Sequence, residues 1–286
     1  MMSKARSLLS WCSAAHGLQR MVGDSSPSRR CSAAWRDSCP LANGVCCGGF
    51  DSTGLMVDLK ASTDGRAPHP GKQPRYRMPG MNPDVVLSNL LALVACALLG
   101  YLTGSISSAI LVARVRGLPD PRTLGSGNPG ATNMLRHAGR GVAATVLVLD
   151  LIKGLLPTLA VHLISGDSVL AMGCAAGACL GHMWPAYFSF RGGKAVATYA
   201  GATFGLSVWL GLGFALVWLG VLRASKVSSL GALAACFSTP LLAVGLDLPP
   251  AICWGCGLVS LLVIARHHGN IRRLLAGDEG RVGDGR

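Results

Sequence analysis

The residues best suited to chemistry begin in a loop, 125–136 (GSGNPGATNMLR), that lies between two apolar segments. Its glycines let backbone N–H groups approach a ligand, its hydroxyl and amide side chains add hydrogen-bonding heads, and its arginine adds a fixed positive fork. This set suits a phosphate, although a solvated turn between helices would share the composition. The candidate site residues of the loop are Ser126, Gly127, Asn128, Gly130, Thr132, Asn133 and Arg136.

A second segment, 181–198 (GHMWPAYFSFRGGKAVAT), places two bare glycines between cations. The backbone amides of Gly192 and Gly193 are predicted to close on phosphate oxygens, while Lys194 supplies a point charge beside the N-terminus of the next helix. Positive-inside anchoring would explain the cations but gives no reason for the glycine pair. A lone His182 is more often a hydrogen-bonded core histidine, but it becomes a candidate because it adjoins this anion site.

A third segment, 266–279 (RHHGNIRRLLAGDE), follows the last apolar run. His267 and Asn270 fall on one helix face at i, i+3, and two arginines follow them, so imidazole, carboxamide and guanidinium groups can converge on one ligand. A charged interfacial helix would account for the arginines. It leaves His267 and Asn270 unexplained.

Two charges lie inside an apolar run, in the sequence LDLIKG. Asp150 and Lys153 are one helical turn apart, and charges within a membrane are costly enough to indicate a paired role that faces the site. We favour a structural ion pair over direct contact with a substrate. The second interpretation stays open.

The chemical groups of these segments are hydroxyls, amides, imidazoles and cations, with almost no acid. Glu279 is the only glutamate of the chain, and the sequence contains neither a Ser-His-Asp order nor a cluster of metal ligands. We therefore predict no metal and no other cofactor. Groups of this kind bind phosphate and stabilise developing negative charge, and they offer no obvious strong protein base.

The composition indicates a membrane protein. Half of the 286 residues are hydrophobic and 14% are charged, whereas soluble globular chains carry about a quarter. The formal net charge of +13 points to anionic partners. In a membrane these are lipid headgroups and phosphorylated substrates, so no nucleic-acid partner is predicted.

Six apolar runs follow in the second part of the chain. A hydrocarbon core of roughly 30 Å needs about 20 helical residues. Lys and Arg mark four loops as cytoplasmic, and this arrangement requires the fourth run to cross twice. We predict an all-α, polytopic membrane helical bundle of about seven transmembrane helices with short cytoplasmic motif loops. The runs are 85–113, 142–165, 168–190, 195–222, 227–246 and 249–265.

The first 80 residues differ from the rest. They mix Ser, Arg, Gly, Pro and Cys without helical or strand periodicity, so residues 1–80 are predicted to be a disordered extension or to precede the true translation start, at Met78 or Met81. A genuine basic extension remains the alternative. Residues 81–286 form the predicted integral-membrane domain.

The three segments, in this order and between spans, resemble the signature motifs of the bacterial PlsY family, the acyl-phosphate:glycerol-3-phosphate acyltransferases. The resemblance covers about residues 85–280 and includes LDLIKG and the loop 225–230 (SKVSSL). It implies a metal-free, seven-span enzyme of the bacterial inner membrane whose active site faces the cytoplasm. Its partners would be glycerol 3-phosphate, acyl phosphate and membrane lipid, and its product lysophosphatidic acid, in the first acylation of phospholipid synthesis.

The resemblance also assigns roles by position. Catalytic roles fall on Ser126, Arg136, His267 and Asn270. Substrate binding falls on Gly127, Asn128, Gly130, Thr132, Asn133, His182, Gly192, Gly193, Lys194 and Ser229, and structural roles on Asp150, Lys153 and Glu279. Arg191 and Ala195 depart from the family pattern, which has lysine and glycine there. The methyl group of Ala195 is costly only if that residue needs a positive φ.

We expect Arg136, Lys194 and the glycine loops to clamp both phosphate groups while the acyl chain lies between helices. The glycerol hydroxyl would lose its proton to a substrate phosphate or to His267, and the sequence does not separate these two bases. An organophosphate transporter with the same loops, and a scaffold inactivated by Ala195, are the competing hypotheses.

Overall fold

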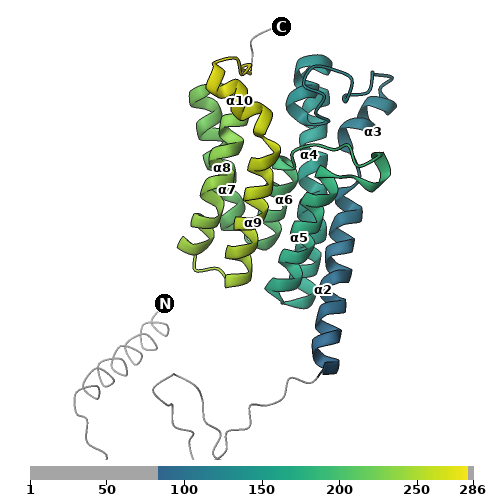
Figure 1. Ribbon diagram of the computed structural model, residues 1–286, viewed down its shortest axis with the longest axis vertical. Coiled ribbons are helices and arrows are strands. Elements are labelled where there is room, and N and C mark those ends of the chain that lie inside the picture. Colours follow the sequence, from purple (N-terminus) through teal and green to yellow (C-terminus); the bar gives the residue numbers. More distant parts are fainter. Residues whose placement is uncertain (1–82, 283–286) are drawn as a thin grey trace, which may run out of the picture. The chain divides into compact units, whose positions relative to one another are not determined.

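The computed structural model describes residues 83–282, and the predicted extension 1–80 lies outside them. Within 83–282 the regular structure is helical throughout, which confirms the all-α prediction (Figure 1). The elements are α2 (Pro83–Gly104), α3 (Ser108–Val115), α4 (Ala131–Ser165), α5 (Ser168–Met183), η2 (Ala186–Phe188), α6 (Val196–Leu206), α7 (Val208–Ser225), α8 (Ser228–Gly245), α9 (Pro250–Arg266) and α10 (His268–Ala276).

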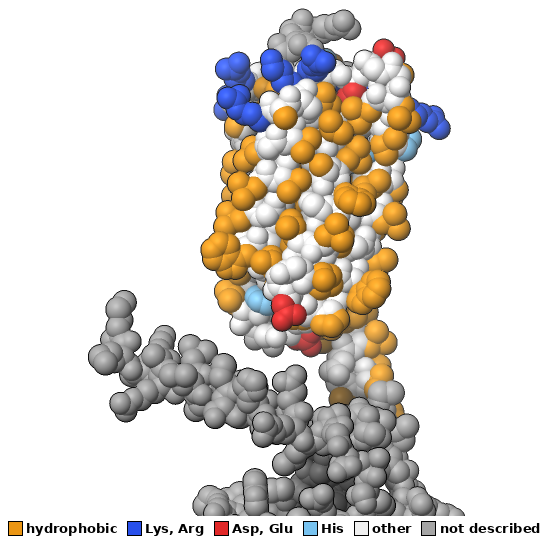
Figure 2. Space-filling view, turned by 90° about the vertical axis from the view of Figure 1, so that its left-hand side faces the viewer, with side chains coloured by type: hydrophobic (Ala, Val, Ile, Leu, Met, Phe, Trp, Pro, Cys, Tyr) orange, Lys and Arg blue, Asp and Glu red, His pale blue; other side chains and the backbone are white. Residues whose placement is uncertain are grey.

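The outer wall of the bundle has the polarity that a bilayer requires. Hydrophobic side chains cover the helical wall along its length, and Lys and Arg gather at one end (Figure 2). Large apolar side chains face outward, such as Leu216 at 69% exposed and Trp254 at 79%. This arrangement is that of an integral, multi-pass membrane protein.

The lengths of the helices support fewer membrane spans than the seven predicted from the sequence. Among the described residues, five helical segments are long and apolar enough to cross a membrane, and six if the bent pair α9 and α10 counts as one. The predicted break in the run 195–222 is present at Ser207, between α6 and α7. However, α6 has 11 residues and rises only about 16 Å, which is too short for a hydrocarbon core of about 30 Å.

Glycines bring two helix pairs unusually close together. A Cβ built on Gly100 of α2 would lie 2.0 Å from the carbonyl oxygen of Cys174 in α5, and one on Gly201 of α6 would lie 1.9 Å from that of Leu151 in α4. Backbones therefore touch, as they do where small residues line helix interfaces in membranes. The tight α4–α6 pair fixes the position of Asp150 relative to the second motif.

The centre of the bundle is α6, with α4 and α5 to one side and α7 to α9 to the other (Figure 1). Tyr199 of α6 is fully buried, donates a hydrogen bond to the carbonyl oxygen of Cys256 (3.0 Å) and packs edge-on against Phe214, with ring centroids 5.5 Å apart. Burial of these aromatic rings holds the two sides together.

The helix α4 is interrupted near its start. Gly139 has a φ of 86°, so the first turns of α4 form a separate short piece. This piece carries Thr132, Asn133 and Arg136, and the break sets its direction independently of the long apolar part.

Candidate active site

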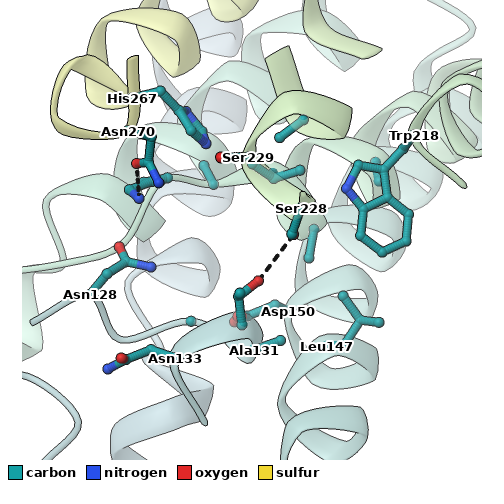
Figure 3. Close-up of a pocket in the computed structure, with 18 of the residues that line it drawn as sticks. Asn128, Ala131, Asn133, Leu147, Asp150, Trp218, Ser228, Ser229, His267 and Asn270 are labelled. Atoms are coloured by element: carbon teal, nitrogen blue, oxygen red, sulfur yellow. Dashed lines mark hydrogen bonds between the residues drawn. The ribbon is translucent and has the colours of Figure 1, made fainter. Parts of the chain in front are cut away.

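A cavity of about 240 Å³ lies where the three motif segments meet (Figure 3). Most of the predicted site residues line it, namely Ser126, Asn128, Gly130, Thr132, Asn133, Arg136, Asp150, His182, Lys194, Ser229, His267, Asn270 and Glu279. Four others do not line it, namely Gly127, Lys153, Gly192 and Gly193. Loops far apart in the sequence thus form one concave site, as is usual for small-molecule binding.

The first motif loop is shaped by Asn133. Its Nδ2 donates to the carbonyl oxygens of Pro121 (3.0 Å) and Leu124 (3.1 Å), and its Oδ1 accepts from the backbone N–H of Ser126 (3.3 Å). A buried amide whose two ends are both engaged by the backbone stiffens the loop. This geometry supports a loop-shaping role for Asn133 beside its predicted contact with substrate.

The glycine pair of the second motif packs against His182. The backbone N–H of Gly193 donates to the carbonyl oxygen of His182 (3.0 Å), and a Cβ on Gly193 would lie 2.2 Å from His182 Nε2. A Cβ on Gly192 would lie 2.1 Å from the same carbonyl oxygen. Glycine is therefore needed at both positions, because a side chain would prevent the loop from packing against α5. Donation from the Gly193 amide to a phosphate, the predicted role, would compete with its existing bond.

Ala195 meets the condition under which its methyl group is costly. It has φ 63° and ψ 15°, is 1% exposed and lines the cavity. Left-handed backbone costs an L-residue roughly 1–2 kcal/mol. The departure from glycine at this position therefore stores strain directly beside Lys194.

His267 presents one free ring nitrogen to the site. Its Nδ1 lies 2.7 Å from the carbonyl oxygen of Val263, and because a carbonyl only accepts, Nδ1 carries the proton. The ring is 2% exposed and lines the cavity, close to Asn270 (Figure 3). The lone pair of Nε2 is then available as a base or acceptor.

Glu279 is the hub that joins the motifs. Its Oε1 accepts from Asn270 Nδ2 (2.6 Å) and Ser229 Oγ (2.8 Å), and its Oε2 accepts from Arg273 Nε (2.7 Å). Lys194 Nζ in turn donates to Asn270 Oδ1. Burial opposes ionisation of Glu279, but the three hydrogen bonds outweigh it and lower the pKa of the carboxyl. These contacts support the predicted structural role of Glu279.

Cations outnumber acids at this end of the cavity. Arg136, Lys194 and Arg273 line it beside Glu279, and Arg136 Nη2 donates to the carbonyl oxygen of Gly280 (3.0 Å). Burial lowers the pKa of Lys194 to about 8, Glu279 acts in the opposite direction, and nearby arginines lower the pKa further. Uncompensated positive charge in a partly buried site attracts a phosphate group.

Asp150 and Lys153 form the predicted ion pair. Lys153 Nζ lies 2.9 Å from Asp150 Oδ1 and donates to the carbonyl oxygen of Ile106 (2.8 Å), and Ser108 Oγ donates to Asp150 (2.7 Å). His182 Nδ1 lies 3.6 Å from the same carboxylate. These contacts tie α3, α4 and α5 together, which supports the structural interpretation, although Asp150 and His182 also line the cavity.

The other end of the cavity is apolar. Its wall comes from Leu147 and Leu151 of α4, Phe204 of α6, and Phe214, Trp218 and Leu219 of α7. Sequence reasoning missed these residues, and also Ser228, whose Oγ lies 3.2 Å from Thr132 Oγ1 and so bridges α8 and α4 (Figure 3). The helix α7 is apolar on all its faces, so periodicity does not separate the residues that face lipid from those that face the cavity.

The fold and the site define a class of protein. It is a polytopic membrane protein with a cavity that is cationic at one end and apolar at the other, which fits a ligand with a phosphate headgroup and a hydrocarbon chain. The chain belongs to the glycerol-3-phosphate acyltransferase family, whose sequence profile matches residues 94–277.

Individual relatives agree. A glycerol-3-phosphate acyltransferase of Thioalkalivibrio sulfidiphilus is 46% identical over 198 residues, covering 68% of this chain and 96% of the relative, and one of Colwellia psychrerythraea is 44% identical over 193 residues, covering 68% and 97%. The crystal structure of PlsY (YgiH), an integral membrane glycerol 3-phosphate acyltransferase, is similar in two forms. The glycerol 3-phosphate form is 37% identical with a TM-score of 0.63, covering 68% and 96%, and the lysophosphatidic acid form is 36% identical with a TM-score of 0.62, covering 67% and 95%.

Proposed function

We propose that this protein transfers a fatty acyl group from an acyl phosphate to the 1-hydroxyl of sn-glycerol 3-phosphate. The products are lysophosphatidic acid and inorganic phosphate, and the reaction is the first acylation of phospholipid synthesis. One observation carries the proposal. The three motif segments, the third of which ends at Glu279, line a single cavity that has three cations at one end and an apolar wall at the other.

Each end of the cavity suits a different part of the substrates. Arg136, Lys194 and Arg273 offer charge-assisted hydrogen bonds to phosphate oxygens. The apolar wall, which includes Leu147 and Trp218, accepts the acyl chain. Holding both substrates here brings the glycerol hydroxyl next to the acyl carbonyl, and such positioning supplies a large part of the rate enhancement. An acyl phosphate is already activated, so the protein need not form a covalent intermediate.

In the reaction, the hydroxyl oxygen of glycerol 3-phosphate attacks the acyl carbonyl carbon, and the bond from that carbon to the phosphate oxygen breaks. Inorganic phosphate leaves with the electron pair of that bond. The hydroxyl proton passes to His267 Nε2 or to the phosphate. Cationic and N–H groups at the polar end stabilise the oxyanion that forms in between.

The same polarity supports a location. The cationic end of the bundle lies on the cytoplasmic face of the membrane by the positive-inside rule, and the relatives are bacterial. The site would then open to the cytoplasm, from the inner membrane of a bacterium, where soluble glycerol 3-phosphate can enter.

The test is a product assay. The purified full chain in phospholipid vesicles is incubated with palmitoyl phosphate and radiolabelled glycerol 3-phosphate, and lysophosphatidic acid is measured. We expect product with palmitoyl phosphate and none with palmitoyl-CoA. Arg136→Gln should abolish most of it, whereas Arg140→Gln, an exposed cation on the same helix, should not. Uptake of label into the vesicles without lysophosphatidic acid would instead identify a transporter.

The identity of the base has its own experiment. A pH–rate profile of His267→Ala decides between His267 and the substrate phosphate. Loss of nearly all activity, together with loss of the acidic limb of the profile, supports His267 as base. Survival of most activity excludes it and assigns the proton to the phosphate.

A further inference from the structure

Arg266, the last residue of α9, does not line the cavity and contacts the loop that precedes α6. Its Nη2 lies 3.3 Å from the carbonyl oxygen of Gly192 and 3.2 Å from that of Gly193, and its Nε lies 3.4 Å from the latter. The guanidinium group also lies over the indole ring of Trp184, 5.4 Å from the centroid. Two carbonyls and an aromatic face together leave this group little freedom.

The loop has few other ties to the bundle. The N–H of Gly193 donates to His182, and Lys194 donates to Asn270. The bonds from Arg266 are therefore a large share of what fixes the backbone directly before Lys194. Without them, the two carbonyls would lose their hydrogen-bond donor, and the backbone that positions Lys194 would no longer be fixed.

The rest of the third motif is held differently, although Arg266 is its first residue. His267 has its own bond to the carbonyl oxygen of Val263, and Asn270 is held by Glu279. A change at Arg266 should thus disturb the second motif more than the third. This asymmetry makes its effect measurable on one substrate.

We infer that Arg266 is a positioning residue. By donating hydrogen bonds to the carbonyls of Gly192 and Gly193, it places Lys194 where it can bind the phosphate of glycerol 3-phosphate. The inference rests on the proposed function. It adds a residue that touches no substrate and acts through the loop. Lysine cannot replace it, because an ammonium group is a point donor that neither serves both carbonyls in a plane nor lies flat on Trp184.

The experiment compares wild type, Arg266→Lys, Arg266→Gly and a matched control, Arg223→Lys, which changes an exposed cation at the end of α7. For each we measure kcat and the KM for both substrates. Arg266→Lys should raise the KM for glycerol 3-phosphate about tenfold, the effect of weakening one or two hydrogen bonds. Its kcat and its KM for palmitoyl phosphate should stay within about twofold of wild type. Arg223→Lys should change neither.

Chemical rescue separates positioning from general support of the fold. Methylguanidinium added to Arg266→Gly should lower the KM for glycerol 3-phosphate, and sodium chloride at equal ionic strength should not. An unchanged KM in Arg266→Lys, or a fall in kcat alone, would overturn the inference. If Arg266→Gly does not fold, Arg266→Lys still decides. A wild-type protein that makes no lysophosphatidic acid would overturn the proposed function instead, which is a separate result.

Discussion

The two ends of the cavity are built on different principles. At the polar end Glu279, Asn270, Lys194 and Ser229 form one connected set of hydrogen bonds, each with a named partner. At the apolar end, side chains of α4, α6 and α7 contribute only contact area. One end depends on a few specific bonds, and the other on the sum of many weak contacts.

This difference predicts how each end responds to change. Members of a hydrogen-bonded set are coupled, so the loss of one partner leaves several buried groups unpaired. Apolar contacts are close to independent and are lost in proportion to the area removed. Variants at the polar end should therefore have large effects that do not add, and variants at the apolar end should have small effects that do.

The largest effect is expected from Glu279→Ala. It removes the acceptor of Asn270, Ser229 and Arg273 at once, so we expect roughly a hundredfold or greater loss of activity and on the order of 2 kcal/mol of stability. Assays and thermal unfolding in detergent measure both. Asp278→Ala, at the exposed neighbour, is the control. An effect of similar size from both variants would show that the tail matters as a segment rather than through its carboxylate.

The next effect is a pH dependence. Burial lowers the pKa of Lys194 to about 8, so its charge is present below that pH and is lost as the pH rises through it. The kcat/KM for glycerol 3-phosphate should then fall above pH 8, by up to about tenfold per pH unit. Lys194→Arg should remove this limb, since arginine stays charged.

The matched measurement is the KM for palmitoyl phosphate, which should not follow the same limb if the acyl chain dominates its binding. A wild-type profile that stays flat to pH 9.5 would contradict either the lowered pKa of Lys194 or its role toward phosphate.

The apolar end should give a smaller, graded response. Leu147→Ala removes part of the wall of the cavity, and we expect the KM for palmitoyl phosphate to rise about fivefold, equivalent to roughly 1 kcal/mol. The KM for glycerol 3-phosphate should not change. Leu163→Ala, on the same helix and 72% exposed, is the control. A hundredfold effect of Leu147→Ala would contradict the contrast between the two ends.

The polar end could largely be predicted from the sequence, because turn-forming and charged residues stand out between apolar runs, although each segment by itself also had a purely structural interpretation. The three loops do meet, and a break within the run 195–222, which lies at Ser207, was expected from the length of the run and from loop charge. The apolar end could not be predicted in the same way. Trp218 and Leu216 both lie on α7, yet one lines the cavity and the other is 69% exposed, and only tertiary packing separates them.

The sequence also misses which groups act through the backbone. The glycines of the second motif suggested amides that point at a phosphate, and the structure has them packed against His182 with their carbonyls bonded to Arg266. The glycine content of a loop indicates that its backbone can approach a neighbour closely. It does not indicate whether that neighbour is a ligand or another helix.

The smallest effect should come from Ala195, which lines the cavity next to Lys194 in the sequence. Its φ of 63° is left-handed, so Ala195→Gly should relieve strain and stabilise the protein by about 0.5–1 kcal/mol, measured by thermal unfolding. Ala197→Gly is the matched control, because this residue also lines the cavity but lies within α6, where glycine should destabilise by a similar amount. If both variants destabilise, the left-handed strain at Ala195 is absent. A large gain in turnover from Ala195→Gly would mean that the methyl group obstructs the site. Activity would then depend on the shape of the polar end as well as on its hydrogen bonds.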